Sequence, residues 1–513
     1  MDSLKLWSMI GLLIYFALLL VAVTREKKNR TVLDYFFAGQ TLPSWALSVT
    51  FIASWWGAGS ALSTADLAFE DGLGAFWYYG VPVLISTFLM SLFAGSIRRV
   101  GYLTQGHMMQ ARYSRGTARF VSLLVLIFMV FNAASQMVGI GEFFGTYLGL
   151  SYEGAIAAGT GIVLFYSMFG GFRGVVLTDI IQFVLLVISA AVVFFVGYSR
   201  AGGLEGIRSA AQATGKPDFL RFSAGASKYS MYVITFGCAW MIQANVWQRI
   251  SAARTDKDAE KMTIMSFFAY IPLYLIVVLT GMAGLALYRE LPKGGVVTAI
   301  VMDSMHPLLG AVVFIGISAA IMSTMDSLIN TASMTWILDL MPQDPDESKQ
   351  LRRSRMATLG VTAAALLISM KVRSILEISW MASDIITTGV FVPLILGFLW
   401  KRGNTRGAKV EYNQMKAFEG ADFIYAKNWA CPGVTNPADY GKILSKDMGW
   451  TVDEAHMAVT NNAYIMHCLP LRRNMIVTDE VIEAPTSLVI PEAANREISA
   501  TVVLKRMLQS LSE

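Results

Sequence analysis

Apolar and polar stretches alternate along the first 400 residues of the chain in a way that predicts membrane-spanning helices. A helix needs about 20 predominantly apolar residues to cross the hydrocarbon core of a bilayer. Windows of this kind predict eleven spans, at residues 6–24, 43–65, 76–96, 119–146, 153–170, 178–199, 229–248, 265–287, 307–338, 357–370 and 377–400.

The charges between these stretches predict an orientation. Segments rich in Lys and Arg follow the first, third, seventh, ninth and eleventh spans, so they fall on one side of the membrane. The opposite segments, such as STADLAFEDG, are poor in Lys and Arg. Because basic loops mark the cytoplasmic side, we expect a multi-pass protein of a bacterial-type inner (plasma) membrane. Its N-terminus would lie outside, and everything after Lys401 would be cytoplasmic.

The order of the spans suggests an internal repeat. If the first helix is peripheral, helices two to six and helices seven to eleven form two groups of five that enter the membrane from opposite sides. An inverted repeat of this kind is a common plan for secondary transporters. The fold class expected is an all-α membrane protein with a 5+5 inverted-repeat bundle and one extra N-terminal helix.

Composition supports a membrane protein and excludes other classes. The 513 residues are 55% hydrophobic and only 15% charged, with a mean hydropathy of +0.52, whereas soluble domains are about a quarter charged. The three cysteines are widely spaced and suggest neither a metal site nor a disulfide framework. No cleavage site follows the first apolar run, so we expect it to be retained as a helix. The expected partners are the lipid bilayer and a small organic solute, with no nucleic acid.

Polar side chains interrupt the ninth span. The segment GISAAIMSTMDSLINTAS carries a carboxylate, Asp326, within an apolar run, where a charge is costly and therefore suggests function. Ser323, Asp326 and Ser327 share a helix face, and Thr324 lies one step round. Their oxygens suit a small hard cation. Alternatively, the hydroxyls bond back to carbonyls of their own helix, which would leave Asp326 unexplained.

The second span has a weak middle. Gly57 and Gly59 stand among serines in SVTFIASWWGAGSALSTAD, as in the discontinuous helices that expose carbonyl groups to ions in transporters. The alternative is a seam of small residues against a neighbouring helix. Trp55 and Trp56 lie too deep for an interfacial belt, which favours the wall of a pocket.

Asp179 follows a glycine-rich turn, GGFRG, that we expect on the cytoplasmic side. One interpretation is an N-terminal cap of the sixth helix. The other is a cation ligand that faces Asp326 and Ser327.

Four segments together resemble the sodium:solute symporter family: YSMFGGFRGVVLTDIIQ, AAIMSTMDS, NVWQRISAA and FVPLILGFLWKRGNTRGA. The resemblance covers roughly residues 1–408. It implies a leucine-transporter-type fold and sodium-coupled symport of a small organic solute by alternating access, with sodium as the co-transported ion and no enzymatic activity. A solute sensor that does not transport is an alternative.

The resemblance also implies positions for the ions. The main sodium site would comprise Ala53, Trp56, Ala320, Ser323 and Thr324. A second sodium site, present in some members, would comprise Asp179, Asp326 and Ser327. Other members often have Ser or Ala at the position of Asp326, so this chain offers an additional carboxylate, which would strengthen cation binding or hold a proton.

The resemblance says less about which residues of this chain would contact the solute. The sugar carriers have a gating tyrosine near the position of Ala239 and Trp240, so this chain departs from the pattern for sugar transport. Gln243 could also form a hydrogen bond between helices. The candidates for the solute pocket are Trp55, Ser60, Trp77, Gln243 and Asn245.

The composition becomes that of a soluble protein near Lys409. Alternation over residues 481–491 predicts a strand, and residues 495–511 a helix, as at the end of an α/β domain. Residues 410–513 resemble the C-terminal part of acetylornithine and succinylornithine carbamoyltransferases. The positions that would line the carbamoyl phosphate and amino-acid site are His467, Cys468, Leu469, Pro470 and Arg496.

We therefore expect two domains, a transmembrane domain over 1–408 and a cytoplasmic fragment over 409–513, joined as a fusion. The symporters usually carry further helices after the eleventh, and here the fragment replaces them. The carbamoyltransferase domain that binds phosphate is absent, so we expect no transferase activity. A membrane-tethered carbamoyltransferase is the alternative.

Overall fold

The computed structural model describes residues 3–25, 31–399, 413–426, 451–467 and 473–490. Contacts divide the chain into two compact units, Met1–Gly403 and Asn404–Glu513, and each is described by itself.

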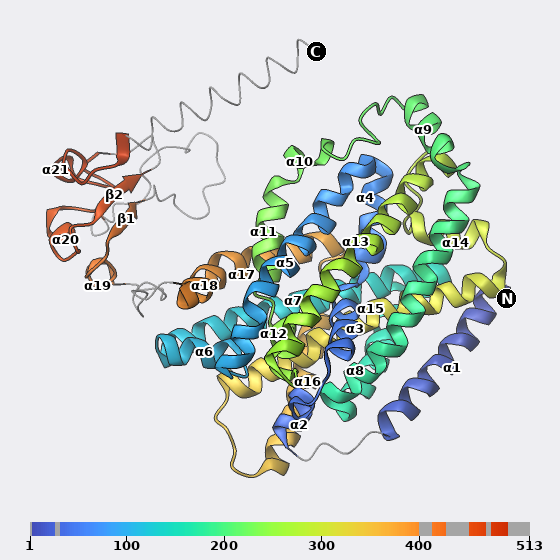
Figure 1. The fold of residues 1–513 in the computed structure, drawn as a ribbon, viewed down its shortest axis with the longest axis horizontal. Helices are drawn as coiled ribbons and strands as arrows, with labels where there is room; N and C mark the ends of the chain where they lie inside the picture. The colour runs from blue at the N-terminus through green and yellow to red at the C-terminus, as the bar shows by residue number, and fades with distance from the viewer. Residues whose placement is uncertain (1–2, 26–30, 400–412, 427–450, 468–472, 491–513) are drawn as a thin grey trace. The chain divides into compact units, whose positions relative to one another are not determined.

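The named elements among the described residues of the first unit are all helices (Figure 1). Its helices are α1 (Ser3–Arg25), α2 (Val32–Phe37), α3 (Ser44–Trp55), α4 (Thr64–Asp71), α5 (Phe76–Val100), α6 (Gln105–Arg112), α7 (Arg115–Leu148), α8 (Tyr152–Arg200), α9 (Gly203–Ala213), α10 (Ala224–Lys228), α11 (Ser230–Met241), α12 (Ala244–Ala252), α13 (Asp256–Leu287), α14 (Val296–Ser304), α15 (Pro307–Thr335), α16 (Glu347–Ser369), α17 (Ile375–Ile386) and α18 (Val392–Leu399). Short 3₁₀ or π segments are η1 (Ala38–Gln40), η2 (Gly59–Ser63), η3 (Gly72–Ala75), η4 (Trp336–Leu340) and η5 (Thr387–Phe391).

Seven helices within the described residues are long and apolar enough to cross a membrane. They cover Ser3–Val23, Gly59–Val100, Arg115–Leu148, Gly170–Arg200, Asp256–Leu287, Pro307–Leu340 and Ile375–Ile395. The difference from eleven predicted spans has physical causes. The expected spans 43–65 and 229–248 are each broken into shorter helices, and the fifth and sixth run together as α8. The expected span 357–370 is the apolar second half of α16, whose first half carries the charged segment ESKQLRRSR.

The glycine-rich turn within α8 is a kink. Gly171 has φ 58° and ψ −163°, a conformation that only glycine adopts readily, while the residues on both sides remain helical. Asp179 therefore lies inside the second half of α8, two turns beyond the kink, and its interpretation as an N-terminal cap is wrong.

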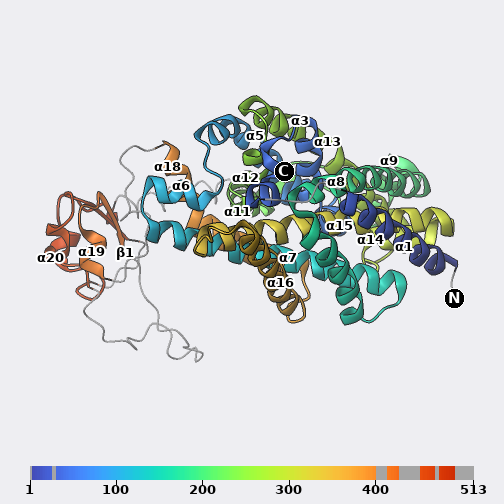
Figure 2. The same cartoon turned by 90° about the horizontal axis from the view of Figure 1, so that it is seen from below.

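Helix α15 occupies the middle of the unit (Figures 1 and 2). Every residue from Gly316 to Thr335 is buried. It packs most extensively against α8 and α7 and also contacts α1, α3 and α16. The polar face seen in the sequence is thus enclosed by protein, which satisfies the requirement that polar groups at membrane depth avoid lipid.

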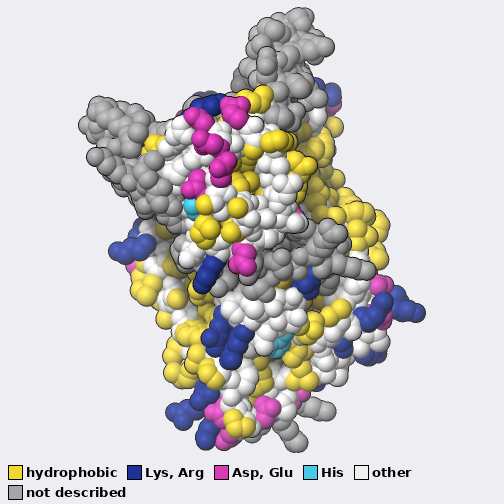
Figure 3. All heavy atoms as spheres, turned by 90° about the vertical axis from the view of Figure 1, so that its left-hand side faces the viewer, with side chains coloured by type: hydrophobic (Ala, Val, Ile, Leu, Met, Phe, Trp, Pro, Cys, Tyr) yellow, Lys and Arg dark blue, Asp and Glu magenta, His cyan; other side chains and the backbone are white. Residues whose placement is uncertain are grey.

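The outer surface is apolar in the way a lipid-facing surface should be. Large hydrophobic side chains such as Leu13, Phe195 and Leu367 are about two-thirds exposed, at 68%, 66% and 67%. Figure 3 shows hydrophobic side chains of this kind reaching the surface on one face of the molecule. Because lipid tails solvate such side chains, their exposure agrees with a multi-pass membrane protein.

The second unit contains a little parallel sheet. Strand β1 (Phe423–Ala426) pairs with β2 (Tyr464–His467), with Phe423 opposite Tyr464. Short helices α19 (Gln414–Phe418), α20 (Glu454–Ala458) and α21 (Asp479–Ile482) accompany it. Phe418, Ile424, Ile465 and Ile482 belong to its small core.

One expectation for this unit is wrong. Val481 and Ile482 belong to helix α21, not to a strand, because Asp479 and Glu480 place acidic side chains in its first turn, where the helix dipole favours them. His467 ends β2 and is fully buried. Cys468, Leu469, Pro470 and Arg496, like the expected helix at 495–511, lie outside the described residues.

Candidate functional site

The break between α3 and α4 is the feature that builds the site. Helix α3 ends at Trp55, and the chain continues through Trp56 and Gly57 before it becomes helical again. The amide of Ala58 after the break donates to Gln136 Oε1 of α7 at 2.8 Å. A Cβ at Gly57 would lie 2.1 Å from that oxygen and 3.0 Å from Thr324 Cβ. Gly57 therefore fits both interpretations of this stretch. It lies at the break in the helix, and its lack of a side chain lets the backbone pack closely against Gln136 and Thr324.

Thr324 meets the open end of α3. Its hydroxyl lies 3.2 Å from the carbonyl oxygen of Ala53 and 3.3 Å from that of Ala320. The last four carbonyls of a helix lack donors within the helix, so the Ala53 oxygen is free for another partner. Trp56 directly follows α3 and is buried. Three of the five residues expected for the main sodium site, Ala53, Ala320 and Thr324, are therefore in contact here, and Trp56 is three residues from Ala53 along the chain.

Ser323 points elsewhere. Its hydroxyl donates to Asp179 Oδ1, and the hydroxyl of Thr50 on α3 donates to Asp179 Oδ2. The structure thus places Ser323 with the residues expected for the second sodium site. Other hydroxyls of α15, such as those of Thr331 and Ser333, do bond back to carbonyls of their own helix.

Arg249 of α12 lies within the expected second site. Its Nη2 is 2.8 Å from Ser327 Oγ, 2.9 Å from Thr50 Oγ1 and 3.4 Å from Asp179 Oδ2. The guanidinium and the Asp179 carboxylate are both fully buried. An enclosed ion pair of this kind needs further hydrogen bonds, and Thr50, Ser323 and Ser327 supply them, while Arg249 Nε has no partner among the described residues.

Asp326 is a second buried carboxylate, within electrostatic range of this ion pair. Its Oδ2 accepts a hydrogen bond from the hydroxyl of Tyr166 on α8 at 2.7 Å. Its Oδ1 is buried without a partner among the described residues. Arg249 offsets the charge of one carboxylate, so an ionised Asp326 would need a bound cation to offset its charge, and a neutral Asp326 would hold a proton.

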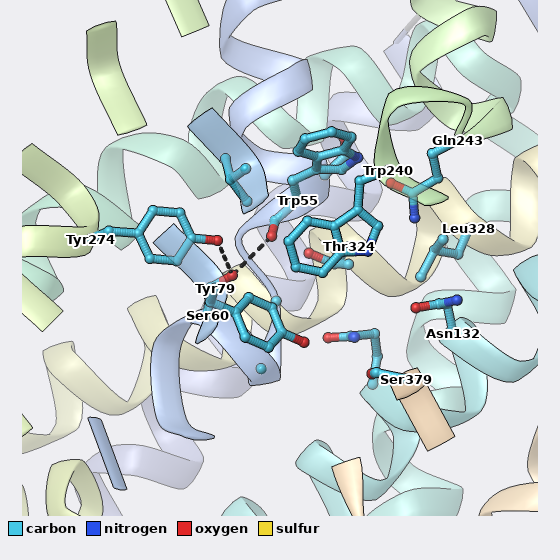
Figure 4. A pocket seen from close by; sticks show the side chains of 15 residues that line it. Trp55, Ser60, Tyr79, Asn132, Trp240, Gln243, Tyr274, Thr324, Leu328 and Ser379 are labelled. Carbon is cyan, nitrogen blue, oxygen red and sulfur yellow. Dashed lines mark hydrogen bonds between the residues drawn. The ribbon is translucent and has the colours of Figure 1, made fainter. Parts of the chain in front are cut away.

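A cavity opens on the other side of Thr324 (Figure 4). Its volume is about 40 Å³, which is room for a few water molecules in this conformation. It lies between the break after α3 and helices α5, α7, α11, α13, α15 and α17. The lining residues are Ser54, Trp55, Gly57, Gly59, Ser60, Tyr79, Val83, Asn132, Gln136, Trp240, Gln243, Tyr274, Thr324, Leu328 and Ser379.

Three of the five candidates for the solute pocket, Trp55, Ser60 and Gln243, line this cavity. Ser60 Oγ lies 2.7 Å from the hydroxyl of Tyr274 and donates to the Trp55 carbonyl at 3.1 Å (Figure 4). The remaining two, Trp77 and Asn245, do not line it. The indole nitrogen of Trp77 donates to the carbonyl of Phe222 at 2.9 Å, and Asn245 is buried one helical turn from Arg249.

Sequence reasoning missed Arg249, because it belongs to the basic segment QRISAARTDKDAEK that was assigned to a cytoplasmic loop. It also missed Thr50 and Tyr166, which look ordinary within their apolar stretches. Gln248, the neighbour of Arg249, is also fully buried and bonds to Asn330 at 2.8 Å. Gln248 and Arg249 are adjacent polar residues in NVWQRISAA, next to an apolar span. Counting Lys and Arg alone assigned them to a loop and so hid the possibility that they are buried.

Comparisons with known proteins divide the chain in two. Residues 391–507 match the aspartate/ornithine carbamoyltransferase family, in its Asp/Orn binding domain. The N-succinylornithine carbamoyltransferase of Bacteroides thetaiotaomicron is 74% identical over 104 residues, which are 20% of this chain. The chain spans only 32% of the length of that relative.

The larger part resembles transporters. The sodium/pantothenate symporter of Escherichia coli (strain K12) is 27% identical over 421 residues, covering 77% of this chain and 86% of that protein. The structure of a Na⁺-coupled sialic acid symporter in a substrate-bound outward-open state superimposes with a TM-score of 0.65 at 18% identity, over 78% of this chain and 88% of that one. At this identity the likeness shows the fold, a transporter-type helix bundle.

Residues 35–411 match the sodium:solute symporter family, and this match covers most of the chain. The helix break at Trp56, the buried oxygens of α15 and the adjoining cavity lie within these residues. The chain therefore belongs to the sodium:solute symporter family.

Proposed function

We propose that residues 1–408 carry out sodium-coupled symport of a small organic solute by alternating access. The observation that carries this proposal is the position of Thr324. Its hydroxyl lies against the carbonyl oxygens of Ala53 and Ala320, and its side chain also lines the cavity. An ion and a solute would therefore share one residue, which is the physical requirement for coupling their binding.

A sodium ion at this position would replace the hydrogen bonds of Thr324 with ion contacts. The ligands would be the carbonyls of Ala53, Trp56 and Ala320 with the hydroxyl of Thr324, and Ser323 could join by turning from Asp179. Oxygen donors of this type suit a hard cation. Such an ion would hold the end of α3 against α15, and so would stabilise the arrangement in which the cavity has its walls in place.

We further propose that Asp326 contributes to a second cation site with Asp179 and Ser327. The support is the unpaired Oδ1 of Asp326 and the excess of two carboxylates over one guanidinium in this network. Arg249 takes the position between Asp179 and Ser327, so a second ion would bind on the Asp326 side.

The membrane potential would then drive transport. Each sodium ion that moves inward across a potential of about 100 mV releases about 2.3 kcal/mol, in addition to its concentration gradient. This term is large enough to concentrate an uncharged solute by roughly fifty-fold, since about 1.4 kcal/mol corresponds to a factor of ten.

The experiment is uptake by the full chain reconstituted in proteoliposomes, with an inward sodium gradient compared with an equal potassium gradient. Sodium-stimulated accumulation that collapses when the gradient is dissipated supports symport. Solute binding without accumulation would instead support a solute sensor.

We infer that the C-terminal fragment does not catalyse carbamoyl transfer. The support is its coverage of about a third of the carbamoyltransferase relative, which leaves out the domain that binds phosphate in the resemblance. Formation of a carbamoylated product from carbamoyl phosphate and N-succinylornithine by the purified chain would overturn this inference.

A further inference from the structure

A second cavity lies at the end of the Pro307–Leu340 span, away from the ion positions. Its volume is about 400 Å³, which lies within the range of ligand sites. One wall is η4 with Met341, and the other is the first half of α16, which packs against α15 and η4. Figure 2 shows α16 beside α7 and α15. None of the residues proposed to bind sodium or solute lines this groove.

The wall formed by η4 is apolar and aromatic. The ring of Trp336 lies against α16, since a Cβ at Gly360 would be 3.0 Å from Trp336 Cζ3. Met341 lines the same wall and is partly exposed. Tryptophan is enriched where membrane spans reach the headgroup region, because its ring is apolar and its N–H is polar. The position of Trp336 near the end of a span fits that boundary.

The wall formed by α16 is basic. Lys349, Arg352 and Arg353 are spaced three and four residues apart, so they share one face of the helix. They belong to the segment SKQLRRSR, one of the basic segments that we expect on the cytoplasmic side. Basic pockets between membrane helices on that side are typical binding sites for anionic lipid headgroups.

The acidic partners of these side chains leave one positive charge over. Lys349 Nζ lies 3.8 Å from Asp346, and Arg353 Nη2 lies 3.1 Å from Asp344. Arg352 makes no ion pair or hydrogen bond within the part of the chain that the structure describes. A guanidinium is well suited to bind two oxygens of one phosphate group at once.

The basic face of α16 continues as an apolar stripe. Met356 follows Arg352 by one helical turn and lines the groove, and Leu359 and Leu367 follow at helical spacing. All three apolar side chains are exposed. The eleven residues from Met356 to Leu367 rise about 16 Å, which is close to half of the roughly 30 Å hydrocarbon core and therefore to the depth of one leaflet.

We propose that this groove binds an anionic phospholipid. Its phosphate would lie at Arg352 and Arg353, and an acyl chain would follow the stripe from Met356 to Leu367. The order of basic and apolar side chains along α16 matches the order of headgroup and acyl chain in a lipid, whereas a free phosphate would make no use of the apolar part. Such a lipid would tie η4, which directly continues α15, to α16 and so stabilise the folded chain. The proposal is independent of the transported solute and of symport.

The test is lipid binding to the purified full chain in a neutral detergent, measured by native mass spectrometry and by thermal unfolding. Dioleoyl phosphatidylglycerol is compared with dioleoyl phosphatidylcholine, which has the same acyl chains and no net charge. We expect the anionic lipid to bind about tenfold more tightly and to raise the unfolding temperature further, because each basic side chain near an anionic lipid contributes about fivefold in affinity. Equal affinity for the two lipids would overturn the proposal.

Two further ligands separate a lipid from free phosphate. Dihexanoyl phosphatidylglycerol has the same headgroup on short chains, and we expect it to bind about tenfold more weakly than the dioleoyl form. Inorganic phosphate at millimolar concentration should not displace the long-chain lipid. Displacement by phosphate, or equal binding of the short-chain and long-chain forms, would show an anion site without a lipid and would overturn the proposal.

A pair of variants locates the site. Arg352→Gln/Arg353→Gln should reduce the preference for phosphatidylglycerol to within about twofold, since two charges that attract the phosphate are lost. Arg99→Gln/Arg254→Gln is the matched control, because it removes two exposed, ion-paired arginines from basic segments expected on the same side. The control should keep the preference. Equal loss in both double variants would indicate general attraction to a basic surface and would contradict a site in the groove. If the first variant does not fold, the comparison of the two headgroups on the wild type still decides.

Discussion

The hydroxyl of Thr324 lies 3.2 Å from the carbonyl oxygen of Ala53, and this contact joins the middle of α15 to the last turn of α3. Both residues are buried, and the cavity begins directly beside Thr324. A small change at the end of α3 would therefore alter the ion position and the solute position together. The predictions below follow from this arrangement and from the charge network on the neighbouring face of α15.

Removal of Arg249 should destabilise the protein strongly. Arg249→Met leaves the Asp179 carboxylate buried without its guanidinium, which typically costs about 3–5 kcal/mol of unfolding free energy. Thermal unfolding in detergent measures the loss. The double variant Arg249→Met/Asp179→Asn should be more stable than the sum of the single changes predicts, because the uncompensated charge is gone. Strict additivity would mean that the two groups do not interact.

Asp326→Asn should remove one of two sodium ions. The change eliminates the excess carboxylate but keeps an acceptor for Tyr166. We expect the Hill coefficient for sodium activation of uptake to fall from above one to about one, since it cannot exceed the number of sites. The matched control is Asp339→Asn. That aspartate accepts bonds from Thr104 at 2.5 Å and Ser122 at 3.0 Å, so its loss should affect stability but not the Hill coefficient. The same coefficient in Asp326→Asn and the wild type would exclude Asp326 from ion binding.

Gly57→Ala should impair uptake although it adds only a methyl group. The new Cβ would lie 2.1 Å from Gln136 Oε1 and would force this side chain away from the Ala58 amide. We expect the initial rate of uptake to fall at least tenfold. Gly161→Ala is the control, because a Cβ there meets nothing within 4 Å. Equal rates for both variants would show that the break tolerates displacement of Gln136.

Ending the chain at Lys409 should leave uptake within about twofold of the full chain. The cavity and the ion positions lie entirely within the unit Met1–Gly403. Uptake per reconstituted molecule, corrected for expression, is the measurement. A large loss with a folded protein would show that the C-terminal fragment contributes to transport.

The sequence identified residues whose polarity is anomalous for their position. Asp179 and Asp326 stand out because a carboxylate in an apolar run requires an explanation. In the structure Asp179 pairs with Arg249, and Asp326 bonds to Tyr166 and lies within electrostatic range of both charges. Trp55, Ser60 and Gln243 likewise lie at the cavity. These residues were identifiable because the cost of burying polar groups acts on single positions.

The sequence did not predict features that depend on how a helix is rotated about its axis or on contacts between residues distant in the chain. Arg249 looked like a loop residue because basic residues follow it, and only its contacts with Asp179 and Ser327 show why it is buried. Trp77 is as aromatic as Trp55, yet its ring packs on Phe222 at 5.3 Å, outside the cavity. No local pattern distinguishes these two tryptophans, because the direction in which a helix faces is set by its neighbours.

The most direct measurement is equilibrium binding of radioactive sodium to the purified full chain, comparing the wild type with Thr324→Ala and with a control, Ser318→Ala. The Ser318 hydroxyl donates to the carbonyl of Phe314 in its own helix at 2.7 Å and belongs to neither proposed ion site. The account predicts saturable binding to the wild type and to Ser318→Ala, and a dissociation constant about three- to tenfold higher for the main site in Thr324→Ala, the range expected for one lost polar contact. Identical sodium affinity in all three proteins would contradict the assignment of the ion to the end of α3, and with it the proposed link between ion and solute.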